Sequence, residues 1–121
     1  MAEIIVMTTA GQSAPVAEEG HPDPAKLITG QYLTKTWNHF TGEDERLYCG
    51  IWESTPGKVS IDYKEWEFCH VIDGKAILTN EESQSWTLGK GQGFIIPSGF
   101  KGTWETVEAV RKHYVILSPK A

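Results

Sequence analysis

Glu67 is the residue of this 121-residue chain that we expect to carry chemistry. A carboxylate in an aromatic, partly desolvated cavity has a raised pKa, which suits proton transfer near neutral pH. Tyr63 precedes it by four residues and could supply a proton or hold a ligand, although packing alone would also explain this tyrosine. The structural alternative for Glu67 is a hydrogen bond to backbone or an ion pair with Arg111 or Lys112. Of these two roles, we predict the catalytic one for Glu67.

Cys69 is a candidate nucleophile on the same strand. Successive side chains of a strand point to opposite faces, so Cys69 shares the face of Glu67 and His70 lies on the other. A neighbouring cation would have to lower the pKa of the thiol for it to react, and a buried, inert cysteine is the alternative.

Aromatic side chains complete the candidate binding site. Trp52 and Trp104 could stack against a planar or amide ligand. His113 could reach the same cavity from the last strand, although the sequence does not establish which face of that strand points inward. The candidate ligand-binding residues are Trp52, Tyr63, Cys69, Trp104 and His113.

Short strands separated by turns must position these residues. From residue 31 onward, runs rich in β-branched and aromatic residues alternate with Gly-, Pro- and Asn-rich turns. Asp73-Gly74 predicts a tight hairpin turn between two strands. The pattern predicts nine or ten short strands without an amphipathic helix. An all-β, antiparallel barrel or sandwich follows.

Five blocks of sequence resemble the cupin superfamily. They are Gly50–Glu53, Thr55–Gly57, Glu67–Gly74, Phe94–Glu105 and Val110–Tyr114. The chain is most similar to the small single-domain branch related to the (S)-ureidoglycine aminohydrolase cupin domain, from about residue 30 to residue 118. The resemblance implies a cupin-type double-stranded β-helix, a jelly-roll barrel.

The same resemblance implies a position for a metal, and the sequence departs from it. Cupins that bind a metal carry two His before the Glu and one His after the second glycine motif. Those positions fall here on Ile61 and Tyr63, or on Ser60 and Asp62 in the other register, and on Gly102. Of the four expected ligands only Glu67 remains, and one carboxylate is too few to hold a metal ion. We expect no metal, no other cofactor, and space for a small molecule beside Gly102.

Composition and charge limit the kinds of partner that we expect the protein to bind. The net charge is −5 and no basic run is present, which argues against nucleic-acid binding. No apolar stretch approaches the roughly 20 residues needed to span a bilayer. The N-terminus lacks the basic region of a signal peptide, so we expect a cytoplasmic protein with reduced Cys49 and Cys69.

The first 30 residues differ from the rest of the chain. Ile4–Met7 predicts an edge strand, and the Pro-rich stretch after it predicts an extended arm. We divide the chain into this strand and arm (1–30) and a single cupin domain (31–121). Edge strands need cover. The resemblance implies how they are covered, because cupins of this kind commonly pair as dimers and often exchange an N-terminal strand. We therefore expect a homodimer that exchanges this strand.

Three functions fit these observations. The first is a metal-independent acid/base enzyme, of lyase, hydrolase or isomerase type, that acts on a small polar metabolite through Glu67. The second is a binding or sensor protein without catalysis, which would keep the same pocket. The third is a metal enzyme with an atypical ligand set.

Overall fold

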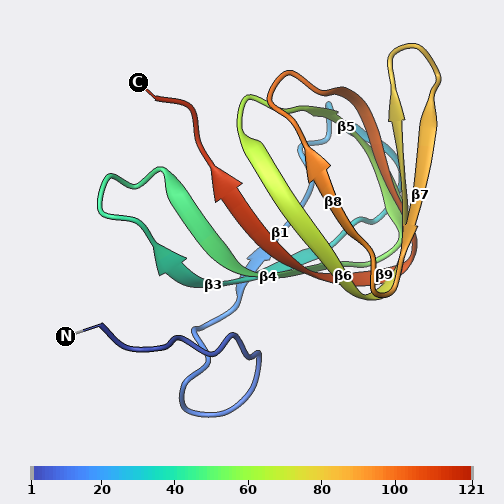
Figure 1. Ribbon diagram of the computed structural model, residues 1–121. Coiled ribbons are helices and arrows are strands. Elements are labelled where there is room, and N and C mark those ends of the chain that lie inside the picture. The colour runs from blue at the N-terminus through green and yellow to red at the C-terminus, as the bar shows by residue number, and fades with distance from the viewer. Residues whose placement is uncertain (1, 121) are drawn as a thin grey trace.

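The computed structural model describes residues 2–120, which form nine strands and no helix (Figure 1). This confirms the predicted all-β class. The strands are β1 (Glu18–Gly20), β2 (Leu27–Gly30), β3 (Thr34–Thr41), β4 (Leu47–Ser54), β5 (Gly57–Asp62), β6 (Trp66–Asn80), β7 (Ser85–Gly89), β8 (Gly93–Ile96) and β9 (Lys101–Leu117).

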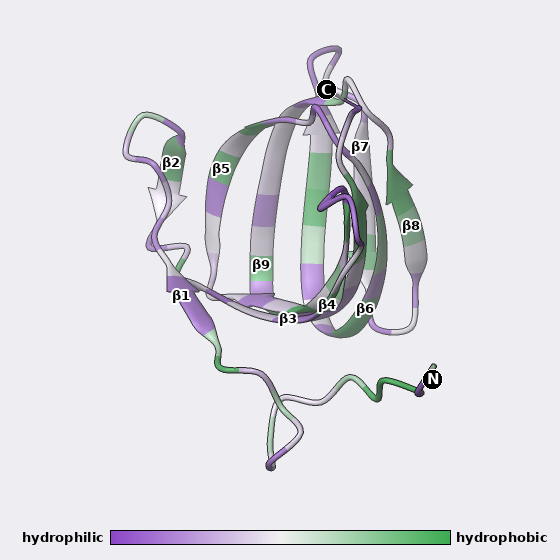
Figure 2. Ribbon diagram, turned by 90° about the vertical axis from the view of Figure 1, so that its left-hand side faces the viewer, coloured by the Kyte–Doolittle hydropathy of each residue, from purple (hydrophilic) through white to green (hydrophobic). Residues whose placement is uncertain are grey.

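Strand β9 pairs with three other strands and joins the parts of the sheet. Along one edge it pairs antiparallel with β6, and along the other it pairs first with β5 and then with β4. Both β7 and β8 pair with β6, whereas β3 pairs with β4 and β1 pairs with β3. The sheet therefore curls on itself, with β2 and β5 on one side and β7 and β8 on the other (Figure 2).

The predicted hairpin turn at Asp73-Gly74 is wrong, because β6 continues through it as one strand. The register between β6 and β9 shifts here, so the pair bends where the sheet curls. Gly74 has a φ of +91°, and a Cβ at this position would lie 2.1 Å from the carbonyl oxygen of Ala109. Glycine is required by this close approach and by the left-handed backbone, and not by a hairpin.

The N-terminal region also differs from the expectation. Residues 4–7 form no strand, whereas β1 and β2 lie within the stretch predicted as an arm. The N-terminal residues contact the outer face of the sheet. The backbone of Thr8 forms hydrogen bonds with the imidazole of His39, and the hydroxyl of Thr9 accepts a hydrogen bond from Arg111. The domain boundary at residue 30 stays a prediction.

The core lies on the concave side of the curled sheet. Its cluster joins side chains from four strands (β5, β6, β8 and β9), namely Val59, Cys69, Ala76, Leu78, Ile96, Trp104 and Val110. None of residues 2–120 forms a helix that could cross a membrane.

Candidate functional site

A cavity of about 480 Å³ lies on the concave side of the sheet, next to the core cluster, with which it shares Trp104. A hollow of about 640 Å³ also exists near the edge of β1, but it lacks the buried charges described below. We therefore place the candidate site in the first cavity. Its walls include Tyr32, Trp52, Tyr63, Glu67, Trp104 and Lys112.

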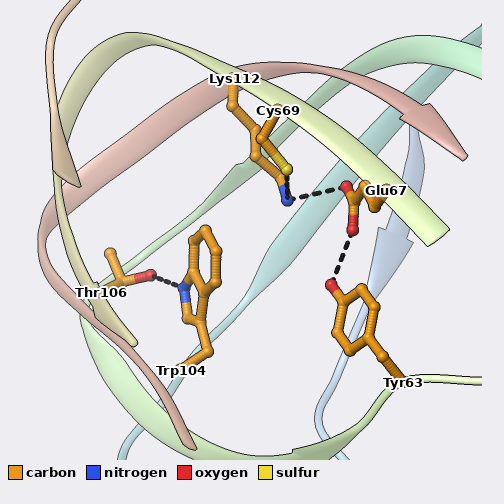
Figure 3. Close-up of polar contacts among 6 residues, drawn as sticks. All are labelled: Tyr63, Glu67, Cys69, Trp104, Thr106 and Lys112. Atoms are coloured by element: carbon orange, nitrogen blue, oxygen red, sulfur yellow. Dashed lines mark hydrogen bonds and ion pairs between the residues drawn. The ribbon is translucent and has the colours of Figure 1, made fainter. Parts of the chain in front are cut away.

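A buried ion pair forms the base of this cavity (Figure 3). The Lys112 ammonium lies 2.9 Å from Oε2 of Glu67, and each side chain is only 5% exposed. Neighbouring strands bring them together: Glu67 on β6 pairs with Ile116 on β9, and Lys112 lies four residues before Ile116, on the same face of β9. The same ammonium donates to Sγ of Cys69 at 3.3 Å.

Two indole rings enclose the ammonium. The nitrogen of Lys112 lies 4.8 Å from the ring centroid of Trp52 and 4.6 Å from that of Trp104. The two rings meet edge to face, and the indole N–H of Trp104 donates to Thr106 at 2.9 Å. A desolvated cation over aromatic faces gains about 2 kcal/mol, so both rings help to hold the charge inside the barrel.

Tyr63 forms a hydrogen bond with the other oxygen of the Glu67 carboxylate. Its hydroxyl donates to Oε1 of Glu67 at 2.7 Å, while Lys112 binds Oε2. Burial raises the pKa of Tyr63 well above its ordinary value, and the negative charge of Glu67 adds to the rise. The phenol therefore stays protonated and acts as a donor.

Glu67 does not have the raised pKa that the sequence predicts. Burial alone would raise the pKa, but the ammonium of Lys112 and the hydrogen bonds from Tyr63 and Lys112 outweigh it and lower the pKa. Glu67 is therefore an anion at neutral pH. The same partner keeps Lys112 charged, because attraction to Glu67 outweighs desolvation and raises its pKa.

Comparison with known proteins then identifies the family. The EutQ-like cupin domain family matches residues 41–114, which is more than half of the chain. The chain belongs to this EutQ-like cupin family. No curated protein matches the chain. The predicted cupin fold is confirmed, whereas the specific relation to ureidoglycine aminohydrolase stays a prediction.

Solved structures agree with the fold of this EutQ-like cupin. A protein of unknown function from Pseudomonas syringae pv. tomato is 27% identical, with a TM-score of 0.77 over 84% of this chain and 44% of that protein. The chain thus spans less than half of that relative. The EutQ protein of Clostridium difficile is 24% identical, with a TM-score of 0.65, over 82% of this chain and 80% of that one. Ectoine synthase from P. lautus is 15% identical, with a TM-score of 0.63, over 82% and 73% respectively.

The EutQ-like cupin brings together most of the residues singled out from its sequence. Trp52, Tyr63, Glu67 and Trp104 all line the cavity. Cys69 faces the same way but lies behind the ammonium of Lys112, fully buried. Desolvation raises the pKa of the Cys69 thiol to about 12, more than Lys112 lowers it, so the thiol is not an activated nucleophile.

His113 does not reach this cavity. On β9 the inward residues are Lys112 and Tyr114, so His113 between them lies on the outer face. There its ring stacks on that of His70, with centroids 5.5 Å apart. The expected side for His70 is thus correct, and the ligand-binding assignment of His113 is not supported by its position.

The expected free volume at Gly102 is also absent. A Cβ at this position would lie 1.8 Å from the carbonyl oxygen of Thr79, because β6 passes directly beside it. Glycine here permits close strand packing. Gly102 borders a separate surface hollow and not the cavity with Glu67.

The residues at the usual cupin metal position do not fit a metal. Within the described part of the chain, no three His, Cys, Asp or Glu side chains gather closely enough to hold an ion. The two nearest potential ligands, Glu67 and Cys69, both accept from the Lys112 ammonium, at 2.9 and 3.3 Å. A metal bound to both would have to displace a buried cation that they already share.

Two residues of the site escaped sequence reasoning. The sequence indicates Lys112 only as a possible partner of Glu67, and the signal that places it inside is its alternation with Val110 and Tyr114, both buried on the inward face of β9. Tyr32 precedes β3 and has a φ of +51°, which no sequence pattern indicates. Its ring lies 6.1 Å from that of Trp52 and lines the cavity.

Proposed function

We propose that this EutQ-like cupin binds a small polar metabolite in the 480 Å³ cavity. The observation that carries the proposal is the network of Tyr63, Glu67 and Lys112 at the base of that cavity. Ligand sites are concave, mostly apolar pockets with a few fixed polar groups. Aromatic walls around one buried ion pair have this composition.

Binding without catalysis agrees best with the state of Glu67. Both of its oxygens already accept hydrogen bonds, and its lowered pKa keeps it ionised. An effective acid or base near neutral pH needs a pKa near that pH. The network supports the role of a rigid polar surface that orients a ligand.

A second candidate is a metal-independent acid/base enzyme, of the lyase, hydrolase or isomerase type. The observation that favours it is the 2.7 Å hydrogen bond between Tyr63 and Glu67 at the cavity wall. Tyr63 would protonate one atom of the ligand, and the Tyr63–Glu67 pair would then take up a proton that another atom of the ligand gives off, which restores the pair. The resemblance to the ureidoglycine aminohydrolase domain points to a small polar metabolite, such as a nitrogen-containing acid, as substrate.

A ligand screen separates the two functions. Metabolites are tested for a shift of the thermal unfolding midpoint, and each hit is then assayed for turnover. We expect hits whose binding is lost in Trp52→Ala, which lines the cavity, and kept in Trp86→Ala, a 41% exposed tryptophan on β7. Turnover that falls in Tyr63→Phe and Glu67→Gln would establish the enzyme. The absence of any hit that depends on Trp52 would refute both functions.

We also propose that the protein is a cytoplasmic homodimer. On the convex face, one register line joins apolar side chains of five adjacent strands, the outer stripe, formed by Phe40, Cys49, Val115, Phe68 and Ile95. The apolar N-terminal residues Ile4 and Val6 are 92% and 72% exposed. Each copy thus offers an apolar surface and an apolar segment, which supports exchange between two copies.

A further inference from the structure

The charges around the cavity favour one sign of ligand. Its lining holds three carboxylates, Glu18, Glu65 and Glu67, and one ammonium, Lys112, a formal charge of −2. Lys112 and Glu67 neutralise each other in their 2.9 Å pair. Neither Glu18 nor Glu65 has an ion pair or a side-chain hydrogen bond within residues 2–120. Two carboxylates therefore remain to act on whatever enters.

The position of Glu18 follows from the sheet register. Glu18 pairs with Thr36, Thr36 with Trp52, and Trp52 with Lys112. Directly opposite residues share a face, so this row runs along the concave side from the mouth of the cavity to its base. The neighbouring Glu19 points the other way and borders the separate hollow near β1.

Tyr32 adds an open hydrogen-bonding group to the same wall. Its φ of +51° is rare for a bulky residue and costs free energy, which the surrounding structure must offset. This backbone is held by Gly57, which leaves room for the Cβ of Tyr32. Within residues 2–120 the Tyr32 hydroxyl has no hydrogen-bond partner, unlike the hydroxyls of Tyr63 and Tyr114.

Aromatic rings also line the cavity. The chain already shows that these walls accept an ammonium, because Lys112 lies over the rings of Trp52 and Trp104. Aromatic faces attract cations through their quadrupole, and carboxylates in a cleft raise the local concentration of cations. An anionic ligand would face Glu18 and Glu65 without an accessible unpaired cation.

We infer that the ligand of this cavity carries a positively charged nitrogen, an ammonium or a guanidinium. Glu18 and Glu65 balance its charge, and the Tyr32 hydroxyl accepts one of its N–H groups. This inference rests on the proposed function, since it names the chemical class of the ligand for the same cavity.

Three probes of one shape test the sign of the charge: butylammonium, butyrate and 1-butanol. Their binding to the full chain is followed by NMR through the indole signal of Trp52. We expect butylammonium to bind at least tenfold more tightly than butyrate. Its affinity should fall several-fold in Glu18→Gln and in Tyr32→Phe, and also with added salt, because exposed charges are screened. Glu19→Gln removes the same charge from the other face of β1 and should leave the affinity unchanged.

Each contrary outcome has a distinct meaning. Equal or tighter binding of butyrate or butanol at Trp52 would overturn the inference and leave the ligand cavity of the proposed function intact. An equal loss in Glu19→Gln and Glu18→Gln would also overturn it, because the effect would then be one of net charge. If none of the probes binds, the inference fails. The proposed function fails with it only if the metabolite screen is empty too.

Discussion

The ammonium of Lys112 lies 2.9 Å from the carboxylate of Glu67, and both side chains are 5% exposed. A buried pair of this kind is costly to desolvate and is weak evidence of stability by itself. Its consequence is that neither member can be removed alone without leaving a charge in the barrel. The indole rings of Trp52 and Trp104 and the hydroxyl of Tyr63 therefore contact a pair that stays charged, and not a group that titrates near neutral pH.

Lys112→Met should lower the free energy of unfolding by about 3–5 kcal/mol, because it leaves the charge of Glu67 buried and unpaired. The loss is measured by urea unfolding followed by tryptophan fluorescence. Lys64→Met is the matched control: it breaks an exposed 3.4 Å pair with Asp62 and should cost at most about 1 kcal/mol. The double variant Glu67→Gln/Lys112→Met should recover much of the loss. Additive effects of the two changes would contradict coupling between these residues.

The pH dependence of stability should report Glu67. Its folded-state pKa lies below the ordinary value of 4.5, so its contribution is present above about pH 4.5 and is lost as the pH falls through the folded-state value. Glu67→Gln cannot lose this contribution. The gap in unfolding free energy between wild type and Glu67→Gln should therefore narrow from pH 7 to pH 3.

A control separates this effect from general destabilisation. Ser54→Ala removes a buried hydrogen bond to Thr106 and no carboxylate. Its unfolding free energy should stay offset from that of the wild type by a similar amount at each pH. If the gap for Glu67→Gln stayed constant as well, the assigned role of Glu67 would be wrong.

The sequence predicted the fold more completely than the site. Alternation and turn residues indicate a curled antiparallel sheet, and the strand parity of Glu67 and Cys69 is correct. The hairpin predicted at Asp73-Gly74 is wrong, because the local sequence of a turn cannot distinguish a hairpin from a bend within one long strand paired with β9. The pKa of Glu67 was predicted with the wrong sign, because its value depends on Lys112, 45 residues away in sequence. A long-range pair of this kind leaves no local pattern.

The two cysteines should differ in reactivity. Cys69 is fully buried with a pKa raised to about 12, whereas Cys49 is partly exposed. Cys49 lies in the outer stripe that the proposed homodimer buries, so the test uses Phe68→Glu, which we expect to be a monomer. In that variant Ellman's reagent at pH 8 should leave one thiol of the folded protein unmodified, and modify two after unfolding in guanidinium. In Cys49→Ser the folded protein should show no rapidly reacting thiol. Rapid modification of folded Cys49→Ser would show that Cys69 is accessible and activated.

The outer stripe should control assembly. Phe68 lies within it, between Val115 and Ile95, and is 37% exposed. A glutamate there would place a charge in the apolar interface that the proposed homodimer buries. We expect the wild type to sediment at twice its 13.5 kDa at micromolar concentration and Phe68→Glu to sediment as a monomer.

Ile28→Glu provides the matched control for this prediction. Ile28 is 50% exposed on β2, outside the stripe, so the same chemical change there should leave the dimer intact. Because Phe68 points away from the cavity, monomeric Phe68→Glu should also keep the affinity for butylammonium. A monomeric wild type would refute the homodimer. Dissociation by both variants would show that added charge disperses the protein without a specific role for this face.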